Sequence, residues 1–361
     1  MLKRLRDDGE GTPKKQTAKR RRLDVHQDEL ESSATSTTSN VENCSSALED
    51  VKKTGSKRKA DSAGEGSSKK KSRTEKTEIK PQTLKNLSVN EQRGLFKDKY
   101  TEEDVLDQGG FGCVFAGYRN EDHLPVAIKH IPKNRLLKIR DQSGKRMSAE
   151  VATMSKLSAG AAGSVGTSAA VSLLDWYDLG KELIVVQERP VPAVDLFTYI
   201  QRNRGALKEK EARVLMKQLV NAAKELEENN IFHRDIKVEN ILIETGSDVP
   251  RVRLIDFGLS CFFKKRSNFR NFCGTADHIP PELYVLQRYR PGPTTVWQLG
   301  IVLFDMLHRT QKFETIQFVG SHQKVKKRLS KNCKDFLRAC CATVPTDRPT
   351  LEELQNHPWL Q

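Results

Sequence analysis

The sequence reads HRDIKVEN at residues 233–240 and LIDFG at residues 254–258, with a short apolar run, ILI, at residues 241–243. The two segments supply aspartate, asparagine and lysine side chains, the residue types that proton transfer and divalent-cation binding require. Either segment alone could be a chance turn or surround a core histidine. Their order along the chain predicts one catalytic centre, from which the rest of the sequence can be interpreted.

Each polar residue of these segments has a distinct chemical task. Asp235 could accept the proton of a substrate hydroxyl, and Lys237 could neutralise a moving phosphoryl group. Asn240 and Asp256 carry the oxygen ligands that Mg²⁺ prefers. The pattern therefore predicts phosphoryl transfer to a hydroxyl group.

Nucleotide-binding features lie further towards the N-terminus. A glycine-rich turn, DQGGFGCV at residues 107–114, would let backbone N–H groups approach phosphates, although such a cluster is more often only a tight hairpin. The run VAIK at residues 126–129 places Lys129 on a strand, and Glu150 lies on the next helical stretch. An ion pair between these two residues would hold the lysine against α- and β-phosphates; the alternative is a surface salt bridge.

In this order the motifs resemble the eukaryotic protein kinases over residues 95–361, and within them the PIM family. The segments that carry the resemblance are LPVAIKH at 124–130, LDW at 174–176, ERP at 188–190, RGAL at 204–207, NILI at 240–243 and NHPW at 356–359, and PPE at 280–282 stands where most kinases have A-P-E. The resemblance implies a serine/threonine protein kinase that transfers the γ-phosphoryl group of ATP, with Mg²⁺, to protein substrates. Lys237 and Thr275 argue for serine and threonine acceptors.

The implied fold class is α+β, the bilobal protein kinase fold. Its small β-rich N-lobe would span about residues 95–188, its hinge about 188–192 and its mostly helical C-lobe about 193–361. The residue pattern agrees, because short β-type runs precede Pro190 and Pro192, which break the chain. Beyond them, one helix face carries Leu215, Leu219, Ala222 and Leu226.

The resemblance also implies the site residues. The catalytic set is Lys129, Asp235, Lys237, Asn240 and Thr275. The nucleotide contacts are Gly109, Gly110, Phe111, Gly112, Val114, Ala127, Lys129, Glu150, Glu188, Pro190 and Asp256, and the metal ligands are Asn240 and Asp256. Glu282 is expected to pair with Arg348 and so to brace the C-lobe. Gly274 and Thr275 are expected to form the shelf on which the acceptor residue lies.

Three positions depart from the common kinase pattern. Asp107 replaces the first glycine of the loop and brings a negative charge near the nucleotide, so activity is expected to fall. Pro190 stands where most kinases donate a backbone N–H to adenine, and the lost hydrogen bond should weaken ATP binding several-fold, while the carbonyl of Glu188 remains available. Gln187 is polar at the back of the adenine pocket, where a local hydrogen bond is its simplest role.

The family's expected preference for basic residues before the acceptor requires carboxylates in the peptide groove. Asp195, Glu239 and Asp305 are candidates for these carboxylates. Thr198 and Thr310 stand where further acids are expected, and the segment at residues 264–270 is basic. The preference therefore remains open on the sequence alone.

Residues 1–94 differ in composition from the rest of the chain and are expected to form a disordered basic tail. No aromatic residue occurs up to Asn90, so this part cannot bury enough apolar surface to fold. Basic clusters lie at residues 14–22, 52–59 and 69–73, which fit a nuclear import receptor or a solvated linker. Nucleic-acid binding is the lesser option, because no aromatic side chain is available to stack on bases.

Composition sets the remaining expectations. The formal net charge of +15 favours acidic partners, and the seven cysteines, without a C-x-x-C pair, indicate a reducing compartment. The chain has no apolar signal segment and no run long enough to span a membrane. We expect a monomer of the nucleus and cytoplasm without membrane attachment.

Two other classes of function compete with an active kinase. A pseudokinase scaffold would bind partners or nucleotide without transferring phosphate, and Asp107 is its main support. A nuclear nucleic-acid adaptor would act through the tail and would lose binding steeply as salt increases.

Overall fold

The computed structural model describes residues 87–110, 112–141, 143–160, 166, 168–309, 312–321, 323, 325 and 328–361. The tail predicted for residues 1–94 lies almost wholly outside the described residues, as do Phe111 and Thr310. Helix α1 (Val89–Lys99) begins within the range predicted for the tail, where Ser88 and Glu91 form a capping box at its start.

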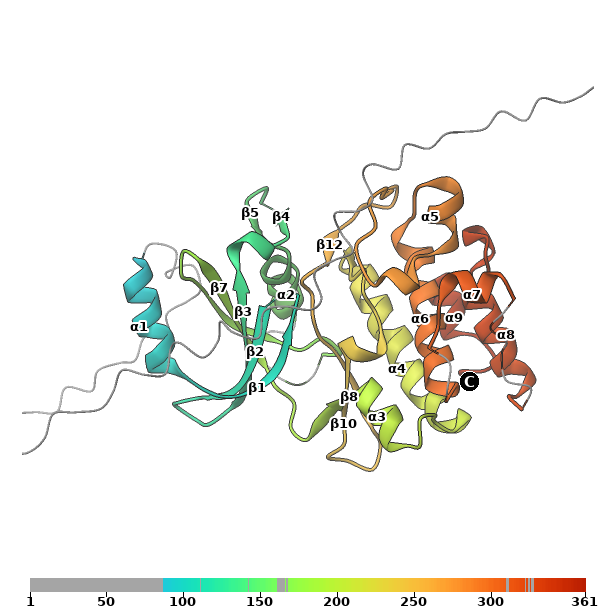
Figure 1. The fold of residues 1–361 in the computed structure, drawn as a ribbon, viewed down its shortest axis with the longest axis horizontal. Coiled ribbons are helices and arrows are strands. Elements are labelled where there is room, and N and C mark those ends of the chain that lie inside the picture. Colours follow the sequence, from blue (N-terminus) through green and yellow to red (C-terminus); the bar gives the residue numbers. More distant parts are fainter. Residues whose placement is uncertain are drawn as a thin grey trace, which may run out of the picture. The chain divides into compact units, whose positions relative to one another are not determined.

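The N-lobe is built on an antiparallel sheet of five strands in the order β1-β2-β3-β7-β6 (Figure 1). The strands are β1 (Tyr100–Gly109), β2 (Gly112–Arg119), β3 (Pro125–Pro132), β6 (Leu173–Asp178) and β7 (Glu182–Glu188). Val126 and Ile128 on β3 are buried together with Val186 on β7, which gives the sheet its apolar face. The neighbouring positions of β3 point to the opposite face, as the two-residue period of a strand requires.

Helix α2 (Ala149–Gly160) contacts β6, and the short hairpin of β4 (Lys138–Arg140) and β5 (Arg146–Ser148) leads into it. A short 3₁₀ turn, η2 (Lys133–Arg135), joins β3 to this hairpin. The first turn of α2 places Glu150 next to the sheet, where it is almost fully buried. This packing is what brings a carboxylate to β3.

The C-lobe is mostly helical. Its helices are α3 (Leu196–Arg202), α4 (Glu209–Glu228), α5 (Pro281–Leu286), α6 (Pro291–Leu307), α7 (Thr315–Val319), α8 (Lys331–Cys340) and α9 (Leu351–Gln355), with 3₁₀ turns η3 (Val238–Asn240), η4 (Ala276–His278) and η5 (Pro345–Asp347). The predicted apolar face of α4 is buried against α6, which is itself buried almost all round. Each large side chain buried in this way contributes roughly 1.5–3 kcal/mol. The α+β fold class is confirmed.

Short strand pairs position the segments that carry the chemistry. Strand β10 (Ile241–Glu244) pairs with β8 (Ala193–Asp195) and β11 (Arg251–Leu254), and β9 (Ile231–Phe232) pairs with β12 (Cys261–Phe262). The β9–β12 pair brings the residues just before His233 next to the residues that follow Gly258. Among the described residues, no helix is long and apolar enough to cross a bilayer.

The glycine-rich turn is tighter than the sequence suggested. Asp107 lies within β1, exposed and opposite Val114, so the turn itself lies between Gly109 and Gly112. Gly112 has a φ of +139°, and a Cβ there would lie 1.9 Å from the carbonyl oxygen of His130. Glycine is therefore required at this position by the approach of β3.

Candidate active site

The catalytic loop is organised by a buried histidine. His233 lies between β9 and η3, and its Nε2 donates a hydrogen bond of 3.1 Å to the carbonyl oxygen of Ile255. Its ring packs 4.8 Å from that of Phe257, and its Nδ1 accepts from the amide of Asp235 at 3.4 Å. Burial lowers the pKa of His233, so the ring is neutral. The histidine thus fixes the loop and does not act as a charged group.

The Asp235 carboxylate is held by donors on both of its oxygens. Oδ1 accepts from the Thr275 amide at 3.0 Å and from the Thr275 hydroxyl at 2.8 Å. Oδ2 accepts from Nδ2 of Asn240 at 3.1 Å and lies 3.4 Å from Nζ of Lys237. Lys237 also donates to the Thr275 hydroxyl at 3.2 Å. The structure therefore brings together four of the five predicted catalytic residues.

The fifth residue, Lys129, lies in a charge network on the sheet. Its Nζ is 3.0 Å from each carboxylate oxygen of Glu150 and 2.7 Å from Oδ1 of Asp256. Burial alone would lower the pKa of Lys129, but the charges of Glu150 and Asp256 outweigh it and hold the pKa above its usual range. The ion pair expected from the sequence is present and is buried.

Gln187 extends this network. Its Nε2 donates a buried hydrogen bond of 2.9 Å to Oε1 of Glu150. The local role predicted for this polar side chain is therefore a specific one, because it orients the carboxylate that binds Lys129. The pairing could not be read from the sequence, since Gln187 and Glu150 lie on different elements.

Asp256 and Asn240 carry the side-chain oxygens that were predicted to hold a divalent cation. Burial would raise the pKa of Asp256, but Lys129 and the Gly258 amide reverse this and hold it below its usual value. Asn240 uses its Nδ2 towards the carbonyl of Asp235 at 2.9 Å, which directs its amide oxygen elsewhere. No group of three or more acidic, histidine or cysteine residues forms a cage in the described part of the chain. Mg²⁺ suits such a sparse set, because it keeps waters and substrate phosphates as ligands.

Two of the predicted nucleotide contacts, Val114 and Ala127, occupy the same sheet face as Lys129. Val114 pairs with Lys129 across β2 and β3, Ala127 lies two residues before Lys129, and alternate residues of a strand share a face. Gly109, Gly110 and Gly112 form the hairpin at the end of β1 and β2. The predicted contacts on the strands are thus side by side.

The hinge carries a buried ion pair that the motifs did not reveal. The guanidinium of Arg253, 1% exposed, donates to the Glu188 carboxylate at 2.6 and 2.9 Å and to Glu244 at 2.7 Å. Glu188 also accepts from the Ser172 amide at 3.1 Å. Burial would raise the pKa of Glu188, but these donors outweigh it and hold the pKa below its usual range. The only sequence signal was a pair of arginines in the otherwise apolar strand β11 before Asp256.

The acceptor shelf and its brace have the expected arrangement. Gly274 has a φ of +140°, and a Cβ there would lie 2.8 Å from the carbonyl oxygen of Arg234, so a glycine is required next to Thr275. Glu282 and Arg348 form the predicted pair at 2.6 and 3.0 Å, and both are buried. The Arg348 guanidinium also lies 4.8 Å from the ring of Trp297. The brace expected from the sequence is confirmed.

The three candidate groove carboxylates have different surroundings. Asp195 caps α3 and accepts from the Thr198 amide at 2.7 Å, while Glu239 lies 3.9 Å from Nζ of Lys312. Asp305 accepts from the Phe313 amide at 3.0 Å, and burial raises its pKa to about 7. Asp305 is therefore only partly ionised near neutral pH, which the sequence could not indicate.

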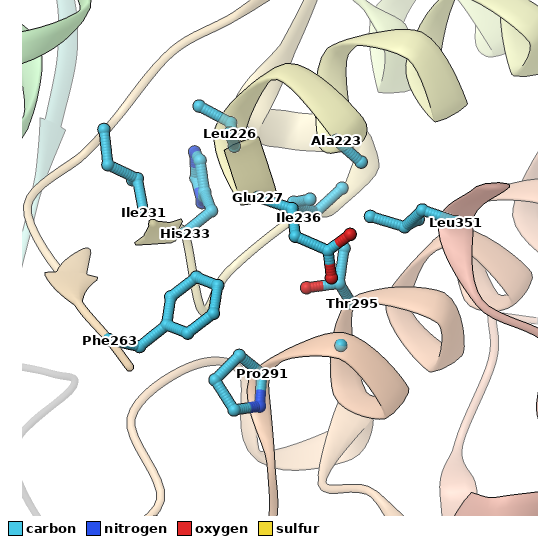
Figure 2. Close-up of a pocket in the computed structure, with 11 residues that line it drawn as sticks. Ala223, Leu226, Glu227, Ile231, His233, Ile236, Phe263, Pro291, Thr295 and Leu351 are labelled. Atoms are coloured by element: carbon cyan, nitrogen blue, oxygen red, sulfur yellow. The ribbon is translucent and has the colours of Figure 1, made fainter. Parts of the chain in front are cut away.

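A small cavity lined mostly by apolar side chains lies behind the catalytic loop, and Lys129, Asp235 and Asp256 are not among the residues that line it. Figure 2 shows His233 and Ile236 of the loop on its wall, with Leu226 of α4 and Leu351 of α9. Its volume of about 10 Å³ is enough for roughly one water molecule and excludes a nucleotide. This cavity is therefore not the nucleotide site, which we place at Lys129, Asp235 and Asp256.

Comparison with known proteins agrees with this geometry. A model of the protein kinase domain matches residues 100–360. The serine/threonine-protein kinase pim-2 of Danio rerio is 34% identical over 287 residues, which are 78% of this chain and 91% of that protein. The serine/threonine-protein kinase prk-2 of Caenorhabditis elegans is 31% identical over 284 residues, 76% of this chain and 62% of that protein. A PAS domain-containing serine/threonine-protein kinase of Mus musculus is 30% identical over 287 residues, 78% of this chain and 20% of that protein.

Proposed function

This chain belongs to the protein kinase family, and from that premise we propose that it transfers the γ-phosphoryl group of Mg-ATP to serine and threonine residues of proteins. The observation that carries the proposal is the Asp235 carboxylate. Thr275 and Asn240 hold it in place, while Lys129 and Asp256 lie in one charge network. A protein that only binds nucleotide has no need for such a positioned base.

In this proposal each residue handles charge or a proton. Asp235 accepts the proton of the acceptor hydroxyl, and Lys237, 3.4 Å from it, stabilises the charge of the phosphoryl group in transfer. Lys129, oriented by Glu150, binds the nucleotide phosphates. Asn240 and Asp256 would hold Mg²⁺, whose charge neutralises that of the phosphates.

The hinge is expected to bind adenine weakly. Pro190 has no N–H to donate, and the loss of one hydrogen bond is worth about 0.5–1.5 kcal/mol. The backbone of Glu188 remains the acceptor, and the buried contact with Arg253 fixes that residue in space. A rigid hinge would therefore offset part of the binding free energy that the missing hydrogen bond costs.

We infer a preference for basic residues before the acceptor, as in the PIM family that the chain resembles. Asp195, Glu239 and Asp305 would supply the negative charge. Because burial raises the pKa of Asp305 to about 7, its contribution should grow as the pH rises above neutrality. We further infer that the protein is a monomer and that it enters the nucleus. The basic clusters at residues 14–22, 52–59 and 69–73 would bind an import receptor.

A direct assay separates this proposal from a pseudokinase scaffold. The purified full-length protein is incubated with Mg-ATP and a positional peptide library, beside Asp235→Asn and Asp256→Ala. We expect phosphate on serine and threonine peptides with upstream arginine or lysine, and a loss of most turnover in both variants. Asp248→Asn, an exposed aspartate in the β10–β11 turn, is the matched control and should keep wild-type activity.

Two results would contradict the proposal. Equal turnover in Asp235→Asn and wild type would remove Asp235 from the reaction. Nucleotide binding without any transfer, in a protein that melts normally, would support the scaffold that Asp107 suggests.

A further inference from the structure

A basic cavity of about 450 Å³ lies apart from the catalytic residues, where β4, α2 and the segment after β12 meet. Its walls carry Arg140, Lys156, Lys264 and Lys265, and two aromatic side chains, Phe262 and Phe263, complete them. Helix α2 contacts both β12 and β4, and Figure 1 shows the β4–β5 hairpin next to α2. The cavity therefore joins the helix that carries Glu150 to the segment that follows Asp256.

The charge of this cavity is strongly positive. Its walls carry four cationic side chains against one carboxylate, that of Asp141. Asp141 accepts hydrogen bonds from Ser143 and from the Lys145 amide, so it is engaged within its own turn. Within the described part of the chain, no ion pair includes any of the four cations. Four cationic side chains that outnumber the single carboxylate in one cavity favour an anionic ligand.

The rest of the lining fits more than a bare anion. Phe262 and Phe263 also line the cavity and are half-buried, so apolar groups lie beside the cations. Nζ of Lys156 lies 5.5 Å from the centre of the Phe262 ring and donates to the carbonyl of Asn229. A ligand that combines a phosphate with neighbouring carbon groups would satisfy both the cations and the rings.

We propose that this cavity binds a phosphorylated serine or threonine of a protein segment. The phosphate dianion would lie between Lys264 and Lys265 on one wall and Arg140 on the other. The flanking peptide would cover the rings of Phe262 and Phe263, which a small polyanion would leave in water. This site is distinct from the acceptor shelf at Thr275 and goes beyond the proposed phosphoryl transfer.

Occupancy of the cavity has a consequence for the active site. A ligand held by Arg140 and Lys264 connects the β4–α2 region to the segment after β12. Glu150 lies in the first turn of α2, at 3.0 Å from Lys129. A ligand bound in the cavity would therefore contact the helix that places Glu150 at Lys129.

The test is a binding titration with the full-length protein and no ATP. The probe is a short fluorescent peptide with one central phosphoserine between alanine and phenylalanine residues, compared with its unphosphorylated twin. The variants Lys264→Glu/Lys265→Glu and Arg140→Glu change two different walls of the cavity. The matched controls are Lys208→Glu/Lys210→Glu on the C-lobe surface and Lys52→Glu/Lys53→Glu at residues outside the described part.

We expect the phosphopeptide to bind the wild type and to raise its melting temperature, and inorganic phosphate to compete with it. Each cavity variant should bind about tenfold more weakly, equivalent to about 1.4 kcal/mol, and each control should change less than about twofold. The melting temperature of each variant without peptide checks that it folds.

Several results would overturn the proposal. Equal binding of the unphosphorylated twin would show that the phosphate is not recognised. An equal loss in Lys52→Glu/Lys53→Glu would assign the binding to non-specific charge. Tight binding of inositol hexakisphosphate with none of the peptide would identify a site for a small polyanion. Because no ATP is present, each of these outcomes leaves the proposed phosphoryl transfer intact.

Discussion

Replacing Arg253 with methionine would test how strongly the hinge is held. Methionine fills part of the arginine's volume but removes the cation that Glu188 and Glu244 share at 2.6 and 2.7 Å. Arg253 is 1% exposed and Glu188 is 8% exposed, so water cannot replace the lost contacts. Removing one partner of a buried ion pair typically costs about 3–5 kcal/mol.

This loss is large against the total stability of a domain, about 5–15 kcal/mol. At roughly 2–4 °C per kcal/mol for a domain of this size, the melting temperature of Arg253→Met should fall by about 6–20 °C. Circular dichroism on full-length wild type and variant measures the shift. Arg251→Met, in the same strand but 38% exposed and 3.9 Å from Glu244, is the matched control and should cost at most about 1 kcal/mol.

The dependence on pH identifies the cause. In the wild type the pKa of Glu188 lies below its usual range, so its contribution is present at neutral pH and is lost only as the pH falls through that lowered pKa. Without Arg253, burial would raise the pKa of Glu188, and its protonation would relieve the unpaired charge. The decrease in melting temperature of Arg253→Met relative to wild type should therefore be smaller at pH 5 than at pH 8.

A second substitution provides the internal check. Gln at position 188 keeps an acceptor for the Ser172 amide but carries no charge, so Glu188→Gln should recover part of the stability lost in Arg253→Met. A melting temperature within about 2 °C of wild type for Arg253→Met, or a deficit that is the same at pH 5 and pH 8, would refute the reasoning.

Three further outcomes follow from the same contacts. Gln187→Leu removes the donor to Glu150 and should lower kcat several-fold in steady-state assays with little change in melting temperature, and an unchanged kcat would show that Glu150 needs no such support. Burial raises the pKa of Asp305 to about 7, so its ionisation lowers the free energy of unfolding as the pH rises from about 4 to 7. The melting temperature of Asp305→Asn should therefore lie a few degrees above that of wild type at pH 8, and the difference should be smaller at pH 5. Asp107→Gly should lower the KM for ATP by less than about tenfold, because it removes a charge near the phosphates, and an unchanged KM at low salt would contradict this.

The sequence predicted most of the charged centre because each motif includes its own chemistry. Lys129, Asp235 and Asp256 were identified from short segments, and the fold brings their elements together as those segments require. Pairings within a motif depend on local backbone geometry, which short patterns specify. The contact between Glu150 and Lys129 was also predictable, because a strand followed by a helix places them on facing surfaces.

The remaining contacts depend on packing between distant elements. Arg253 meets Glu188 only because β11 passes behind the hinge, and charge patterns along the chain do not encode that crossing. Asp107 was placed in the turn because glycines follow it, yet strand pairing with Val114 extends β1 beyond it. The glycine variant at position 107 therefore gains no turn flexibility and should lose about 0.5–1 kcal/mol of stability within the strand.

The end of β7 connects the two networks that these experiments perturb. Successive residues of a strand point to opposite faces, so Gln187 reaches Glu150 on α2 while Glu188 reaches Arg253 on β11. One side of the strand end thus orients the charge around Lys129, and the other fixes the hinge backbone. Because the two contacts do not share a partner, Gln187→Leu should change kcat and Arg253→Met should change stability and the KM for ATP. If both variants instead altered kcat and KM by the same factors, the strand end would act as one rigid unit, and the separation of its two faces would have no functional meaning.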